Sequence, residues 1–166
     1  MLFRSDNGEL HQEVKDILAY LANKPDVILG TGHGSRDEID KLVREAVNTY
    51  GIRRILVNHP HYMIGANMDD IESWAKLGCY IELNAVAFVE GSHFKSNDIS
   101  EAKEMICRCG LDRIVIDSDY GQKNNGSPVA GVAKFIELLQ SACGLTNDDI
   151  RRIGETNPAW LLGLEL

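Results

Sequence analysis

The chain has 166 residues, of which 44% are hydrophobic and 25% are charged, a composition ordinary for one compact domain. It contains 17 Lys and Arg and 25 Asp and Glu, so its net charge is −8. This charge disfavours a nucleic-acid surface, because phosphate binding needs clustered basic residues. No apolar run approaches the ~20 residues of a membrane helix, and the N-terminus turns polar too early for a signal peptide. We therefore expect a cytoplasmic protein whose residues 1–166 form a single α/β domain.

Segments with helical periodicity alternate with short apolar segments rich in β-branched residues. Residues 9–22 open the chain as a predicted helix. The predicted strands are 27–30, 54–58, 79–86 and 113–117, and the helices between and after them are 36–49, 68–77, 98–108 and 128–142. Thr146 and Asn157-Pro158 open two further short helices. Ser35, Asn67 and Ser127 are the predicted N-caps, and Glu38 completes a capping box with Ser35.

This alternation predicts parallel strands joined by right-handed helical crossovers. Four βα units form either a small open sheet or half of an eight-stranded (β/α) barrel. In both cases the working residues of such folds lie where the strands end.

Polar side chains follow each of the predicted strands. His33 lies in a glycine-rich turn after the first strand, and Asn58-His59-Pro60-His61 ends the second. Glu82 and Asn84 share one side of the third strand, and the fourth ends in Asp117-Ser118-Asp119. Histidine and carboxylate side chains that converge on one edge are suited to a divalent metal ion.

Three of these assignments leave alternatives open. Glu82 lies inside an apolar strand, where a carboxylate must be paired or bound to metal, and a salt bridge to Arg54 is the other reading. His61 is either a ligand or a surface histidine. Of Asp117 and Asp119 we favour Asp119 as the strand-end acid, because it lies beyond the apolar run where the loop opens.

The segments TGHGSRDEI, ILVNHPHY, IVIDSDYGQ and the ending NPAWLLGL together resemble the C-terminal half of metal-dependent hydrolases of the amidohydrolase superfamily, which are TIM barrels. The resemblance implies that His33 and His59 match the metal ligands after the fifth and sixth strands of those barrels. It implies that Asp119 matches the aspartate after the eighth strand, which assists proton transfer and can bind metal.

The expected function is a metal-dependent hydrolase, in which a metal-bound water attacks an amide, ester, lactone or phosphoester bond of a small-molecule substrate. The expected ion is zinc, with manganese or iron as alternatives. His33, His59, His61 and Asp119 are the expected ligands, and Asp119 and Glu82 the expected catalytic groups. Two alternatives are a catalytically inactive barrel fragment that serves as a structural or partner module, and a phosphate- or nucleotide-binding domain that uses the turn at 30–35.

The chain departs from the family because nothing in it matches the His pair after the first strand or the ligand on the fourth. A half-barrel leaves two sheet edges and an apolar inner face open. We therefore expect a homodimer, association with a separate N-terminal half, or a sheet covered by its own helices, with the homodimer favoured. Neither nucleic acid nor a membrane is an expected partner.

Overall fold

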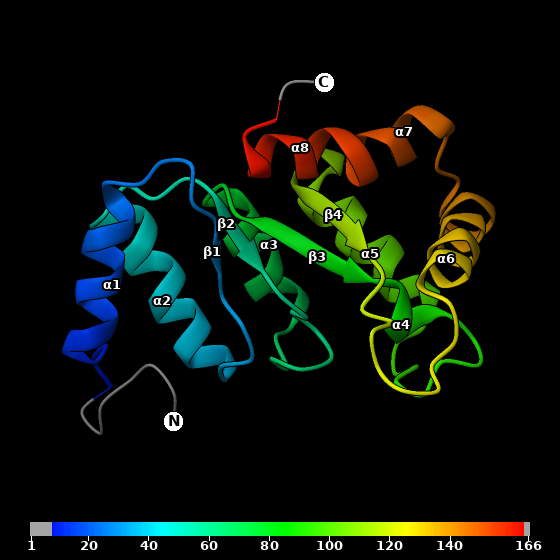
Figure 1. Cartoon of the computed structure of the whole chain (residues 1–166), viewed down its shortest axis with the longest axis horizontal. Helices are drawn as coiled ribbons and strands as arrows, with labels where there is room; N and C mark the ends of the chain where they lie inside the picture. The colour runs from blue at the N-terminus through cyan, green and yellow to red at the C-terminus, as the bar shows by residue number, and fades with distance from the viewer. Residues whose placement is uncertain (1–7, 165–166) are drawn as a thin grey trace.

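The computed structural model describes residues 8–164, and the ends of the predicted domain, 1–7 and 165–166, lie outside them. A parallel sheet with the strand order β1-β2-β3-β4 forms its centre (Figure 1). The strands are β1 (Leu29–Gly30), β2 (Ile55–Val57), β3 (Tyr80–Asn84) and β4 (Ile114–Asp117). In the register of β3 with β4, Glu82 lies opposite Val115 and Asn84 opposite Asp117. The predicted α/β class with parallel strands is confirmed.

Helices fill the connections, as the periodicity predicts. They are α1 (Gln12–Ala22), α2 (Arg36–Asn48), α3 (Met68–Lys76), α4 (Ala85–Phe88), α5 (Ile99–Cys109), α6 (Pro128–Cys143), α7 (Asn147–Arg151) and α8 (Asn157–Leu162), with a 3₁₀ turn at Leu111–Arg113 and a π-helical turn at Arg152–Thr156. Two predicted N-caps form local hydrogen bonds: Asn67 accepts from the backbone of Asp70 at 2.9 Å, and the Ser35 backbone donates to Glu38 at 3.0 Å. Within residues 8–164, no helix has the length and apolar character to span a membrane.

The third predicted strand is too long. The predicted range was 79–86, but β3 ends at Asn84, which is the N-cap of α4. All four residues of α4 are buried, and the backbone N–H of Val86 donates to the carbonyl of Ser118 at 3.1 Å, beyond β4. A continuous apolar run carries no periodicity that would mark where a buried strand changes into a buried helix.

One face of the sheet packs against helices. Side chains of Ile55, Ile81 and Ile114 join the main hydrophobic core, which also contains Trp74 of α3 and Phe135 of α6. Right-handed crossovers between strands in sequential order place their helices on the same side of a sheet. The core therefore lies between the sheet and a single layer of helices.

The opposite face of the sheet is covered in part by the last helix. Tyr80 and Val115 point to this face and bury Leu161 of α8 between them, in a second and smaller apolar cluster. The ring of Trp160 lies 5.5 Å from that of Tyr80. In Figure 1, α8 crosses the sheet near the amino-terminal ends of the strands. The carboxyl-terminal half of this face carries the polar residues described next.

Candidate functional site

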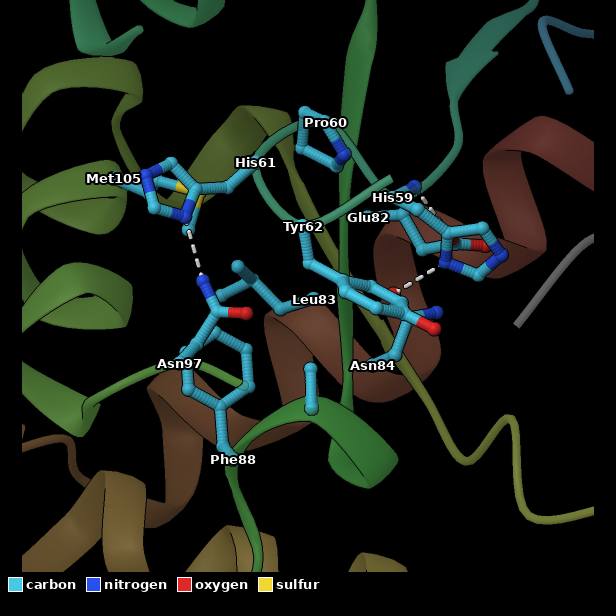
Figure 2. A pocket seen from close by; sticks show the side chains of 11 residues that line it. His59, Pro60, His61, Tyr62, Glu82, Leu83, Asn84, Phe88, Asn97 and Met105 are labelled. Atoms are coloured by element: carbon cyan, nitrogen blue, oxygen red, sulfur yellow. Dashed lines mark hydrogen bonds and ion pairs between the residues drawn. The ribbon is translucent and has the colours of Figure 1, made fainter. Parts of the chain in front are cut away.

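The polar residues predicted at the strand ends form a hydrogen-bonded network on the face of the sheet that α2, α3 and α5 leave free. Glu82, Asn84 and Asp117 are on this face, because they alternate with Ile81, Leu83 and Ile116 of the helix-packed face. His59 follows β2 and points toward Asn84 (Figure 2). Along the strands, the network lies on the carboxyl-terminal side of the apolar cluster that α8 covers.

Glu82 is buried and held by residues of the loop after β2. Its Oε1 accepts from the Nδ2 of Asn58 at 2.9 Å, and its Oε2 accepts from the backbone N–H of His59 at 2.9 Å. The Nδ1 of His59 lies 3.1 Å from the same Oε2. The alternative reading, a salt bridge to Arg54, is wrong, because the ion-pair partner of Arg54 is Asp26.

The ring of His59 is oriented by the end of β3. Its Nδ1 lies 2.7 Å from the Oδ1 of Asn84, whose Nδ2 donates to Asp117 at 2.8 Å. Since both neighbours of Nδ1 are acceptor oxygens, the proton of the neutral imidazole belongs on Nδ1. The lone pair is then on Nε2, which is the form that binds a metal ion or accepts a proton.

The carboxyl groups of Glu82 and Asp117 interact, and this shifts the pKa of each. Burial, the hydrogen bond to Glu82 and the charge of Glu82 raise the pKa of Asp117 to about 8. Burial also raises the pKa of Glu82, but the hydrogen bonds from Asp117 and Asn84 and the charge of His59 outweigh it, so this pKa lies below its ordinary value. At neutral pH, Asp117 is therefore the neutral donor and Glu82 the anion.

A second histidine lies beside His59. The ring centroids of His33 and His59 are 4.8 Å apart, and the ring planes are tilted by 55°. His33 is exposed and has no hydrogen bond or ion pair to any residue in the described range 8–164. The structure thus brings together two of the three histidines predicted as metal ligands, from the ends of β1 and β2.

The other two predicted ligands have different partners. His61 points away from His59 (Figure 2), and its Nδ1 lies 2.6 Å from the Nδ2 of Asn97 and 3.5 Å from Glu101. Asp119 accepts from Gln122 at 3.1 Å. Between residues 8 and 164 there is no group of three or more His, Cys, Asp or Glu side chains placed to hold a metal ion.

A small cavity separates His61 from the network. It has a volume of about 10 Å³ and extends from His59 and Asn84 to Asn97 and Met105 (Figure 2). That volume is the space of a single water molecule at most. This cavity is therefore too small for an organic ligand, and the side of His59 where His33 lies is outside it.

The backbone is strained at two of the predicted site residues. His59 and Asp119 both have φ = 45°, in the left-handed region that side chains with a Cβ rarely adopt. Asn124 also has a positive φ, 68°, and Asn, Asp and His adopt this region more readily than other residues with a Cβ. Strained residues persist where the surrounding structure holds them and are concentrated at functional sites.

We expect Asp119→Ala to be less stable than Asp119→Gly by about 1 kcal/mol, because only glycine adopts the left-handed conformation without a steric penalty. Both variants lose the same hydrogen bond from Gln122, so the difference between their stabilities reports the cost of the backbone conformation. Urea unfolding measures the difference. The control is the same pair of substitutions at Lys103, exposed in the middle of α5. There the glycine variant should be less stable than the alanine variant. Equal stability of the two Asp119 variants would show that the backbone there is unstrained.

Asn58 and Thr31 are parts of the network that the sequence analysis did not single out. The hydroxyl of Thr31 accepts from the backbone N–H of Asn58 at 3.1 Å, and Asn58 Oδ1 accepts from the N–H of Gly32 at 3.2 Å. A Cβ at Gly30 would lie 3.2 Å from that same oxygen, so the close approach favours glycine. The signal for Asn58 was its position directly before His59, at the end of an apolar strand.

Comparison with known proteins gives one partial match. The model of a family of unknown function (DUF6282) matches residues 2–82. No curated protein and no solved structure shows a significant match. The matched range contains His33, His59 and Glu82 but ends before Asn84 and Asp117. The first half of this chain is therefore similar to a family whose function is not known.

Proposed function

We propose that this chain is a half-barrel of the amidohydrolase type and carries one side of the active site of a metal-dependent hydrolase. The sequential strand order supports this proposal, as does the position of the helices that connect the strands, which form a layer on one face, whereas only α8, after the last strand, packs on the other. In a TIM barrel each strand pairs with its neighbour in the chain, and the helices all lie outside. A doubly wound sheet instead reverses its strand order and has helices on both faces.

The pair of His33 and His59 is the observation that carries the proposal. Their rings are 4.8 Å apart, a separation at which two imidazoles can bind one ion, and Nε2 of His59 has the lone pair that this requires. Asn84 and Glu82 hold the opposite nitrogen, which is how metal-binding histidines are usually oriented. When bound, a divalent ion such as zinc would lower the pKa of a water molecule and polarise the bond to be hydrolysed.

The remaining groups take roles that follow from their contacts. Asp119, in its strained loop, is the proposed base and further ligand. Glu82 is a positioning residue, because its oxygens are occupied by Asn58 and His59. His61 is left out of the ligand set, since its ring is held by Asn97 and Glu101.

The alternative of an anion site at the turn 30–35 has less support. The backbone N–H and the hydroxyl of Ser35, at the start of α2, both donate to the carboxylate of Glu38, at 3.0 and 2.9 Å. Glu38 is buried there, 3% exposed. A phosphate at this helix end would meet a negative charge that already uses these donors.

Two histidines do not complete a metal site. Structural and catalytic zinc sites use at least three protein ligands, and the described residues hold no such group. We therefore include in the proposal that a second copy of the chain supplies the missing ligands. The open sheet edges at β1 and β4 are the places where such a partner would pair.

The test is elemental analysis of the purified chain after incubation with zinc and gel filtration, which gives metal content and oligomeric state together. We expect near-stoichiometric zinc in the wild type and a loss of at least about tenfold in affinity for His33→Ala and His59→Ala. His11→Ala, an exposed histidine before α1, is the matched control and should bind as the wild type does.

Zinc that is retained by both His33→Ala and His59→Ala would refute the ligand assignment. A folded wild type that takes up no zinc in any oligomeric state would favour the inactive barrel fragment instead. Circular dichroism of each variant separates loss of metal from loss of fold.

A further inference from the structure

A second cavity lies at the opposite end of the sheet from His59. Its volume is about 230 Å³. It is lined by the following residues: Val47, Ile52, Arg53, Ile55, Leu77, Gly78, Arg113 and Trp160. These come from α2, from the segments just before β2, β3 and β4, and from α8. The cavity is thus built by five separate parts of the chain around the amino-terminal ends of the strands.

The charge of this cavity is opposite to that of the protein. Two arginines line it, and no acidic side chain is among its described lining residues, although the chain has a net charge of −8. Arg53 is exposed and forms no hydrogen bond or ion pair to any residue between 8 and 164. Arg113 donates one N–H to the carbonyl of Gly78 at 3.1 Å and has its remaining N–H groups for a ligand. A guanidinium with free donors is suited to carboxylate or phosphate groups.

The rest of the lining is apolar and includes an ordered aromatic ring. Trp160 is 46% exposed, yet its ring is held between Tyr80, at 5.5 Å, and the guanidinium of Arg54, at 5.6 Å. Arg113 lies 5.4 Å from the ring of Tyr80 and is fixed in the same stack. Ordered side chains lose little entropy when a ligand binds.

The cavity thus has one arginine without a partner among the described residues, one arginine held in place, and an apolar wall. We infer that it binds a small organic anion. The carboxylate or phosphate of this anion would contact Arg53 and Arg113, and its apolar part would lie against Trp160. The volume is below the usual range of pockets for drug-sized ligands, and it suits a ligand of the size of benzoate or phenyl phosphate. The cavity is separate from the proposed hydrolase site in space, because it lies at the amino-terminal rather than the carboxyl-terminal ends of the strands.

The test is a titration of the ¹⁵N-labelled chain with benzoate, phenyl phosphate and benzamide, observed through the indole N–H signals. The chain has two tryptophans, and Trp74 is fully buried and bonded to Asp40 at 3.0 Å, so its signal is an internal control. We expect the Trp160 signal to shift with benzoate and phenyl phosphate in the millimolar range. Neutral benzamide should bind at least about fivefold more weakly. The tighter of the two anions identifies the natural head group.

Arg53→Gln should weaken anion binding by about five- to tenfold without affecting the fold, because its side chain has no partner to lose. Arg151→Gln makes the same change of charge at an exposed position away from this cavity and should leave binding unchanged. The inference is overturned if neither anion shifts the Trp160 signal, or if benzamide binds as tightly as benzoate. It is also overturned if Arg53→Gln and Arg151→Gln change the affinity for the anions equally.

Discussion

Asp117→Asn is expected to stabilise the protein by about 2 kcal/mol or more at neutral and alkaline pH, and to remove most of the fall in stability that the wild type shows as the pH rises from the ordinary aspartate range to about 8. Folding raises the pKa of Asp117 to about 8, through burial and the neighbouring Glu82. The folded chain therefore holds a proton that the unfolded chain has released. The stability contributed by this proton is complete below the ordinary aspartate range and is lost as the pH rises through about 8.

The amide introduced by this substitution reproduces the neutral acid. It can donate to Glu82 and still accept from Asn84, as the protonated Asp117 does. Urea unfolding at pH 5, 7 and 9 measures the effect, with the wild type as reference. Curves for the variant and the wild type that run parallel across this range would show that Asp117 ionises normally.

Glu82→Gln is the informative counterpart to that substitution. The carboxylate of Glu82 accepts from both Asn58 and the backbone of His59. An amide has only one acceptor oxygen, so one of these donors would face an NH₂ group. We expect a loss of about 2–3 kcal/mol at pH 7, where Asp117→Asn is expected to stabilise the protein instead.

Asn157→Ala is expected to destabilise the protein by about 2–3 kcal/mol. Asn157 is 4% exposed, and its Nδ2 donates to the carbonyls of Leu111, at 2.8 Å, and Ile114, at 2.6 Å. It therefore ties the start of α8 to the start of β4. Alanine would leave both carbonyls without their donor in the protein interior.

Asn23→Ala is the matched control for this measurement. Asn23 makes the same kind of bond, from its Nδ2 to the carbonyl of Ala19 at 3.0 Å, but on the exposed surface, where water replaces it. We expect a change within about 0.5 kcal/mol. If the two asparagine variants lose equal stability in thermal or urea unfolding, burial does not explain the role of Asn157.

Most element boundaries were predictable because their signals are local. Asn67 caps α3 and Ser35 pairs with Glu38 through contacts within four residues. The end of β3 was not predictable in this way, since Ala85 and Val86 continue the apolar run and only the contact with Ser118 shows why the chain turns there.

The composition of the site followed from the period of two in a strand, but its orientation did not. Glu82 and Asn84 had to share a face, and parallel pairing brings Asp117 beside them. By contrast, His61 is two residues beyond His59, outside the strand. The left-handed backbone at His59 turns the chain, so that His61 faces Asn97 instead. A loop dihedral of this kind has no sequence signal at a histidine.

The position of α8 has a consequence for any assembly of the proposed half-barrel. Leu161 fills the face between Tyr80 and Val115, which is the face that becomes the interior when eight strands close. An incoming chain and α8 are thus competitors for one surface, and the free energy of docking α8 is subtracted from the free energy of association. The apparent affinity equals the intrinsic affinity multiplied by the fraction of molecules in which α8 is released. Substitutions that weaken the contacts of Leu161 would make the monomer less stable and at the same time a better partner.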